Sequence, residues 1–133
     1  MTKKVNLLFV CVENSNRSQM AQAFAKIIGG DKVEAFSAGS KPSGKINPKA
    51  IHAMSLLNYD LSKHDSKSLN EIPNIEYDFA ITMGCGDECP LVNAKNRIDW
   101  EIPDPRNMEG DDFLTIRELV KTKVDALLKS LSI

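Results

Sequence analysis

The segment FVCVENSNRSQM, from Phe9 to Met20, decides the fold of this chain. The run that leads into it, Val5 to Val10, is apolar except for one Asn, which predicts a short buried strand. From Ser18 onward, apolar residues recur at helical spacing, which predicts a helix to about Ile28, ended by a Gly-Gly pair. A strand, a tight loop and a helix in this order direct backbone N–H groups and a helix N-terminus toward an anion.

The loop holds a candidate nucleophile and a candidate charge clamp. Cys11 stands at the end of the predicted strand, where the positive field of the loop would stabilise its thiolate. Arg17 offers a planar guanidinium that can bind two oxygens of a tetrahedral oxyanion. The alternative is that Cys11 only packs the strand end, as buried free cysteines commonly do. The polar residues of the loop favour the functional interpretation, and its expected oxyanion-binding residues are Val12, Glu13, Asn14, Ser15, Asn16, Arg17 and Ser18.

Length and composition narrow the classes of protein. The chain has 133 residues, enough for a single core, so we expect one domain over residues 1–133. Its net charge of -1 gives no general attraction to nucleic acid or to anionic membranes, and no segment has the length of a membrane span. Three cysteines are an odd number, which argues against a disulfide scaffold and for thiol chemistry in the cytoplasm. We expect a cytoplasmic monomer.

Strands and helices alternate along the rest of the chain. The remaining strands are predicted at Val33–Phe36, Phe79–Met83 and Arg97–Ile102, and the remaining helices begin after Asn47 and at Asp111 or Asp112, the first of them running to Leu57. This alternation predicts an α/β fold, a three-layer α/β/α arrangement with a four-stranded parallel sheet in the flavodoxin-like order 2-1-3-4. Ligands of such sheets bind beyond the carboxyl ends of the strands. Cys11 and Cys85, each at or just beyond a strand end, are therefore expected on the same rim.

Several segments carry a resemblance to a known family. VCVENSNRSQMA, FSAG from Phe36, INPKAI from Ile46, TMGCGDECP from Thr82 and the Asp104-Pro105 pair occur in this order. Together they resemble the low-molecular-weight tyrosine phosphatase superfamily, and RSQMA resembles its thiol- or thioredoxin-coupled arsenate reductase branch. The resemblance implies reduction of arsenate to arsenite with no tightly bound cofactor. It also implies that reducing equivalents come from thioredoxin or from a low-molecular-weight thiol and glutaredoxin system.

The same resemblance implies roles for individual residues. The Cys11 thiolate takes arsenate, Asp104 acts as general acid, Cys85 displaces arsenite and Cys89 receives the disulfide. Cys85 and Cys89 are closer in sequence than the corresponding cysteines of the best-known branch, so an external thiol remains an alternative to Cys89. We expect no metal site, because structural zinc sites usually use a closer cysteine pair and a second matching pair. His64 is not expected to act as a catalyst.

Supporting roles are implied around the loop. Asn14 is expected to brace it, and the Ser18 hydroxyl is expected to hydrogen-bond the thiolate. Glu13 is expected to face solvent, because an inward carboxylate would repel a dianion. Some reductases of this family bind potassium beside the loop through acidic side chains, and the matching positions here are Gln22 and Lys67. Whether the Lys67 ammonium replaces that ion is left open by the sequence.

Two other functions stay open at this level. A phosphatase would need only Cys11, Arg17 and Asp104, and a weak phosphatase side activity is expected in any case. A non-catalytic metal or redox sensor would use the three thiols without turnover. Arg106 and Asn107 stand where tyrosine phosphatases tend to place aromatic residues that grip a phosphotyrosine ring. Their presence favours a small inorganic oxyanion as the substrate.

Overall fold

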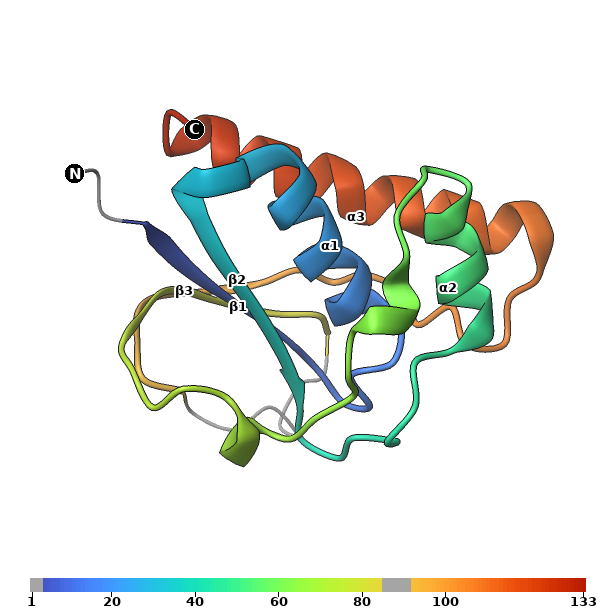
Figure 1. The fold of residues 1–133 in the computed structure, drawn as a ribbon, viewed down its shortest axis with the longest axis horizontal. Helices are drawn as coiled ribbons and strands as arrows, with labels where there is room; N and C mark the ends of the chain where they lie inside the picture. Colours follow the sequence, from blue (N-terminus) through green and yellow to red (C-terminus); the bar gives the residue numbers. More distant parts are fainter. Residues whose placement is uncertain (1–3, 85–91) are drawn as a thin grey trace.

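The computed structural model describes residues 4–84 and 92–133 (Figure 1). Its four strands form one parallel sheet in the order β2-β1-β3-β4. The strands are β1 (Val5–Cys11), β2 (Val33–Gly39), β3 (Tyr77–Thr82) and β4 (Ala94–Asp99). The helices are α1 (Arg17–Gly29), α2 (Pro48–Ser55) and α3 (Gly110–Ser130), with 3-10 turns η1 (Gly30–Lys32), η2 (Leu61–Lys63) and η3 (Leu69–Glu71). The predicted four-stranded parallel sheet and its strand order are confirmed.

Alternation along β1 builds a core on each face of the sheet. Leu7, Phe9 and Cys11 join a large core that α1 and α3 cover, and the two helices lie together on that face in Figure 1. Leu8 and Val10 point the other way, into a smaller core. The side chain of Cys11 therefore lies on the same face as α1, the helix that the loop leads into.

Three strands have other bounds than predicted, and one of them, β3, spans Tyr77–Thr82 rather than Phe79–Met83. The apolar residues within Arg97–Ile102 suggested a strand, but β4 starts and ends earlier in the chain. Trp100 and Ile102 lie beyond the strand end and are buried in the large core, so their apolar character reflects packing rather than sheet pairing. β2 is longer than predicted, because its pairing with β1 continues to the Cys11–Gly39 pair.

The helix ends also depart from the prediction in places. Asn47 caps α2 as predicted, with its side chain accepting a backbone N–H. However, α2 ends before Leu57. The N-cap of α3 is Glu109 and not Asp111 or Asp112. The two aspartates instead lie in the first turn, where their charge interacts favourably with the helix dipole.

The fold positions the carboxyl ends of β1 and β3 side by side, since these two strands are neighbours in the sheet. Cys11 ends β1. Cys85 and Cys89 follow β3 in sequence, but both lie outside the described residues. None of the helices in the described ranges is long and apolar enough to cross a membrane.

Candidate active site

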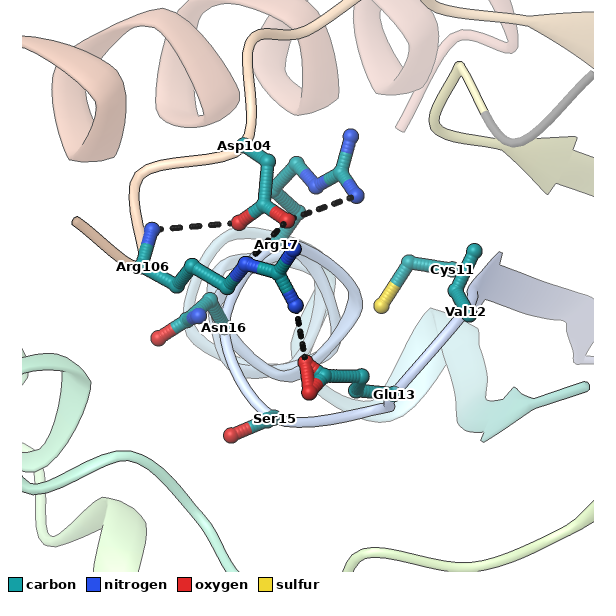
Figure 2. A pocket seen from close by; sticks show the side chains of 8 residues that line it. All are labelled: Cys11, Val12, Glu13, Ser15, Asn16, Arg17, Asp104 and Arg106. Carbon is teal, nitrogen blue, oxygen red and sulfur yellow. Dashed lines mark hydrogen bonds and ion pairs between the residues drawn. The ribbon is translucent and has the colours of Figure 1, made fainter. Parts of the chain in front are cut away.

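The loop from residue 12 to residue 16 wraps around a small cavity (Figure 2). The cavity has a volume of about 160 Å³, well below the roughly 300–1,000 Å³ of pockets for drug-sized ligands. It brings together Cys11, Arg17 and Asp104, the three residues that the sequence predicts for oxyanion chemistry. The full lining is Cys11, Val12, Glu13, Ser15, Asn16, Arg17, Asp104 and Arg106. Its size suits a small anion.

The carbonyl oxygens of the loop are all bonded to groups outside it. They accept hydrogen bonds as follows: Val12 from Lys41 N at 2.8 Å, Glu13 from Ser43 N at 3.0 Å, Asn14 from Gln19 Nε2 at 3.1 Å, Ser15 from Asn47 N at 3.2 Å and Asn16 from Met20 N at 3.0 Å. Within the described part of the chain, the backbone N–H groups of Glu13 to Asn16 donate no hydrogen bond. Unpaired N–H groups in a loop at a helix N-terminus form an anion-binding concavity.

Asn14 braces the loop, as predicted. Its φ of 51° lies in the left-handed region, which Asn tolerates better than most residues. The side chain is fully buried, and its Oδ1 accepts from Lys67 N at 2.9 Å and from Gln19 Nε2 at 2.8 Å. Its Nδ2 donates to Ser18 Oγ at 2.8 Å. These bonds fix the loop to both α1 and the segment before η3.

Cys11 has the hydroxyl neighbour that was predicted for it. The side chain is only 3% exposed, and Sγ lies 2.9 Å from Ser18 Oγ. Because Ser18 Oγ already accepts from Asn14, its own hydrogen is available to the sulfur. The expected hydrogen bond between the Ser18 hydroxyl and the Cys11 sulfur is therefore present in the structure.

Gly39 has a role that sequence reasoning missed. A Cβ atom built on Gly39 would lie 2.5 Å from Val12 O and 3.0 Å from Asn14 N. Any side chain there would push the loop out of its anion-binding shape, so the close approach of β2 requires glycine. The FSAG segment was noticed only as part of the resemblance.

Arg17 is held by backbone carbonyls while part of its guanidinium stays available. It is 7% exposed, and its Nη1 donates to Met83 O and, at 2.8 Å, to Ile102 O. Nη2 lies 3.8 Å from Asp104 Oδ2. With Nη1 occupied, the edge formed by Nε and Nη2 can bind two oxygens of an anion in the cavity.

Arg106 crosses the entrance of the cavity, a position that the sequence did not reveal. Its Nη1 lies 3.2 Å from Glu13 Oε2, and its Nε lies 3.6 Å from Asp104 Oδ2 (Figure 2). Instead of facing solvent as predicted, the Glu13 carboxylate lies at the edge of the cavity, where Arg106 offsets its charge. Glu13 and Arg106 are 93 positions apart, so no local pattern links them.

His64 is buried beside the loop rather than free in a polar segment. It is 9% exposed, and burial is the main cause that lowers its pKa to about 4, with neighbouring lysines adding to the effect. Its Nδ1 lies 3.0 Å from Gln19 Oε1 and its Nε2 2.6 Å from the Tyr59 hydroxyl. The separation of 45 positions between His64 and Gln19 explains why sequence reasoning missed this contact.

We expect His64 to make the protein less stable in mild acid. The histidine pKa is about 6.5 in the unfolded chain, so the unfolded state takes up the proton first as the pH falls. The free energy of unfolding should then fall by about 3 kcal/mol between pH 6.5 and the folded pKa of about 4. Urea unfolding of the wild type and of His64→Asn at pH 7 and pH 4.5 measures this. An equal loss in both proteins would contradict the assignment.

The positions matched to the potassium site of some reductases are engaged with the protein. Lys67 Nζ donates to Asp65 O at 2.7 Å, and burial is the main cause that lowers the pKa of Lys67. Gln22 donates to Ala35 O at 3.2 Å and accepts from Ser37 Oγ at 2.6 Å. In residues 4–84 and 92–133, no three His, Cys, Asp or Glu side chains lie close enough together to hold a metal ion.

Comparisons with known proteins agree with this geometry. Residues 6–133 match the family model described as low molecular weight phosphotyrosine protein phosphatase. The chain is 36% identical over 133 residues to a glutaredoxin arsenate reductase of Synechocystis sp., covering 98% of this chain and 99% of that protein. A solved arsenate reductase in a phosphate-binding state superimposes with a TM-score of 0.86 at 34% identity, over 95% of this chain and 98% of the other. A thioredoxin-dependent arsenate reductase of Corynebacterium glutamicum gives a TM-score of 0.79 at 32% identity, over 98% of this chain and 63% of the other.

Proposed function

Because the chain belongs to the low molecular weight phosphotyrosine protein phosphatase family, we propose that it uses the anion loop of that family to reduce arsenate to arsenite. The observation that carries this proposal is the arrangement of the loop around Cys11. All its carbonyl oxygens from residue 12 to residue 16 are bonded outward, and unpaired N–H groups surround the cavity. The names of the relatives support arsenate as the oxyanion.

In the first step, the Cys11 thiolate attacks the arsenic atom of arsenate. An arsenic–oxygen bond breaks, and the oxygen leaves as water after Asp104 supplies a proton. The loop N–H groups and the Nε–Nη2 edge of Arg17 bind the remaining oxygens and stabilise the charge that develops on them. The product is an arsenic(V) adduct on the Cys11 sulfur.

In the second step, the Cys85 thiolate attacks the sulfur of Cys11. The sulfur–arsenic bond breaks with its electron pair moving to arsenic, which leaves as arsenite, and a Cys11–Cys85 disulfide forms. Phosphorus cannot accept this electron pair, so only arsenate turns over in this way. Cys89 or an external thiol then takes over the disulfide, and thioredoxin or a glutaredoxin-type thiol system returns two electrons. Such reductants keep thiols reduced in the cytoplasm, where we place the reaction.

The direct test is arsenate-dependent oxidation of NADPH, assayed separately with thioredoxin plus its reductase and with glutathione, glutaredoxin and glutathione reductase. We expect turnover with at least one system. Absence of turnover with both, combined with rapid hydrolysis of an aryl phosphate, would favour the phosphatase alternative.

Replacement of Cys85 separates reduction from hydrolysis. We expect Cys85→Ser to lose arsenate turnover and to keep any hydrolysis of a small aryl phosphate, because hydrolysis needs only the Cys11 loop and an acid. Cys89→Ser is the matched control. It should lose turnover with thioredoxin only if Cys89 receives the disulfide. Equal loss of both activities in folded Cys85→Ser would contradict the proposed division of labour.

The charge of Glu13 should weaken arsenate binding. We expect Glu13→Gln to lower the KM for arsenate about two- to five-fold with little change in kcat, since one negative charge at the cavity edge is removed and Arg106 loses one of its two carboxylate partners. The size follows from the value of exposed ion pairs, about 0–1 kcal/mol. Glu34→Gln, which removes an exposed ion-paired carboxylate at the other end of β2, should leave KM unchanged. An increase in KM for Glu13→Gln would overturn this interpretation.

A further inference from the structure

We propose that Lys49, in the first turn of α2, is a positioning residue for Asp104, the group that protonates the leaving oxygen. Lys49 does not line the cavity around Cys11. It contacts the segment from residue 103 to residue 109, which carries Asp104 and leads into α3. The inference rests on the proposed function in taking Asp104 as the general acid.

The segment that carries Asp104 has little regular structure of its own. Residues 103–109 form no strand or helix, and most of them, Asp104 included, are exposed. Asp104 Oδ1 accepts from Arg106 N at 3.1 Å, and Pro105 O accepts from Met108 N at 2.9 Å. These two bonds shape a turn but do not attach it to the rest of the protein. An exposed turn opens readily unless other groups hold it.

The Lys49 ammonium attaches this turn to α2. Its Nζ donates to Met108 O at 2.9 Å and to Arg106 O at 3.3 Å, and it lies 2.7 Å from Glu109 Oε1. An ammonium has three hydrogens, so each of these acceptors can take one. Two of the acceptors are backbone carbonyls. The contact therefore fixes the path of the chain and not only the place of a side chain.

The first turn of α2 is also bonded to the anion loop. Asn47, the N-cap of α2, donates its N–H to Ser15 O at 3.2 Å, and its Oδ1 accepts from Lys49 N at 2.9 Å. Toward its other end, α2 is held on α3 by Arg117, whose Nη1 donates to Ala53 O at 2.9 Å (Figure 1). One short helix thus connects the loop that binds the oxyanion to the turn that carries the acid.

Asp104 needs this connection because its own contacts hold it weakly. Its Oδ2 lies 3.8 Å from Arg17 Nη2 and 3.6 Å from Arg106 Nε, and its side chain is 39% exposed (Figure 2). Long contacts between exposed charges contribute little. Proton transfer, in contrast, requires the acid within about 2.6–3.2 Å of the accepting oxygen. A turn released from Lys49 would spend less time with Asp104 in that range.

The test compares substitutions of Lys49 with matched controls. Lys49→Met keeps the apolar stem and removes the ammonium, whereas Lys49→Arg keeps a charged group with several N–H donors. Glu109→Gln removes the exposed ion pair and leaves both carbonyl contacts. Lys95→Met makes the same chemical change as Lys49→Met at an exposed ion pair on β4. The measurements are arsenate turnover at saturating reductant and amide exchange at Met108, which needs no substrate.

We expect Lys49→Met to lower kcat about ten-fold and to leave KM for arsenate within about two-fold, because placement of the acid affects the chemical step more than anion binding. Lys49→Arg should recover most of the loss. Glu109→Gln and Lys95→Met should stay within about two-fold of the wild type. Amide exchange at Met108 should be about three-fold faster in Lys49→Met and unchanged in Lys95→Met.

A double-mutant cycle tests whether Lys49 acts through Asp104. Asp104→Asn removes the acid, so adding Lys49→Met to it should lower kcat by less than about two-fold more. Wild-type kcat in Lys49→Met, an equal loss with and without the Asp104 carboxyl, or unchanged amide exchange at Met108 would overturn the inference. A wild type without arsenate turnover would instead contradict the proposed function. The same cycle on hydrolysis of an aryl phosphate, which needs the same acid, would then decide the inference.

Discussion

Replacement of Cys11 by serine should lower arsenate turnover by a factor of about 10³ or more, the scale seen when a nucleophile is removed from other covalent catalysts. A serine hydroxyl is almost wholly protonated at neutral pH and cannot form the disulfide that releases arsenite. Its oxygen can still accept from Ser18, whose hydroxyl lies 2.9 Å from the Cys11 sulfur, so the loop should keep its shape.

Two measurements make this expectation specific. Coupled NADPH oxidation gives the loss of turnover, and calorimetric titration with inorganic phosphate gives anion binding. We expect binding to persist in Cys11→Ser, since the N–H groups of the loop are unchanged. Arsenate turnover by Cys11→Ser within ten-fold of the wild-type rate would contradict the proposed mechanism.

The second large effect is expected at Arg17. Arg17→Lys should lower kcat/KM for arsenate about 10²- to 10³-fold, comparable to the removal of an oxyanion-binding donor elsewhere. The guanidinium meets two demands at once, because Nη1 donates to Met83 O and Ile102 O while its other edge is available to the anion. A lysine has a single nitrogen and cannot meet both.

Arg106 provides the matched control for this substitution. Arg106→Lys makes the same chemical change at the entrance of the same cavity, but the Arg106 side chain is 57% exposed, whereas that of Arg17 is 9% exposed. We expect Arg106→Lys to change kcat/KM only a few-fold, since exposed charges are well solvated. Similar losses in both variants would show that positive charge alone, and not the held geometry of Arg17, matters for turnover.

The parts of the fold that could be predicted are those that a local pattern of residues in the sequence indicates. The strand, loop and helix around Cys11 follow from neighbouring residues, and the strand order follows from alternation and known topology. The end of β4 was misplaced because Trp100 and Ile102 are apolar for packing rather than for pairing. Local sequence does not distinguish these two causes.

The residues of the candidate site could likewise be predicted only in part from the sequence. Cys11, Arg17 and Ser18 lie close together in the sequence, at the two ends of the same loop. Their presence in one site could therefore be predicted. Asn14 was also predicted to brace the loop, but other groups that hold the loop in shape come from distant positions, and nothing near Cys11 indicates those. Gly39 meets the loop through the pairing of β2 with β1, and His64 meets it across the turn after α2. Contacts of this kind depend on tertiary packing and appear only in the folded structure.

The unpaired N–H groups from Glu13 to Asn16 also bear on the step of the reaction at which arsenate is distinguished from phosphate. These donors respond to the charge and tetrahedral shape of an anion, and phosphate has both in common with arsenate. Abundant cellular phosphate should therefore compete for the empty loop, so arsenate has to displace it. Discrimination then falls to the redox step, because only arsenic can take the electron pair from sulfur. Under the proposed mechanism the selectivity is therefore kinetic: we expect phosphate to be a reversible occupant that slows arsenate entry, with the irreversible choice made after binding.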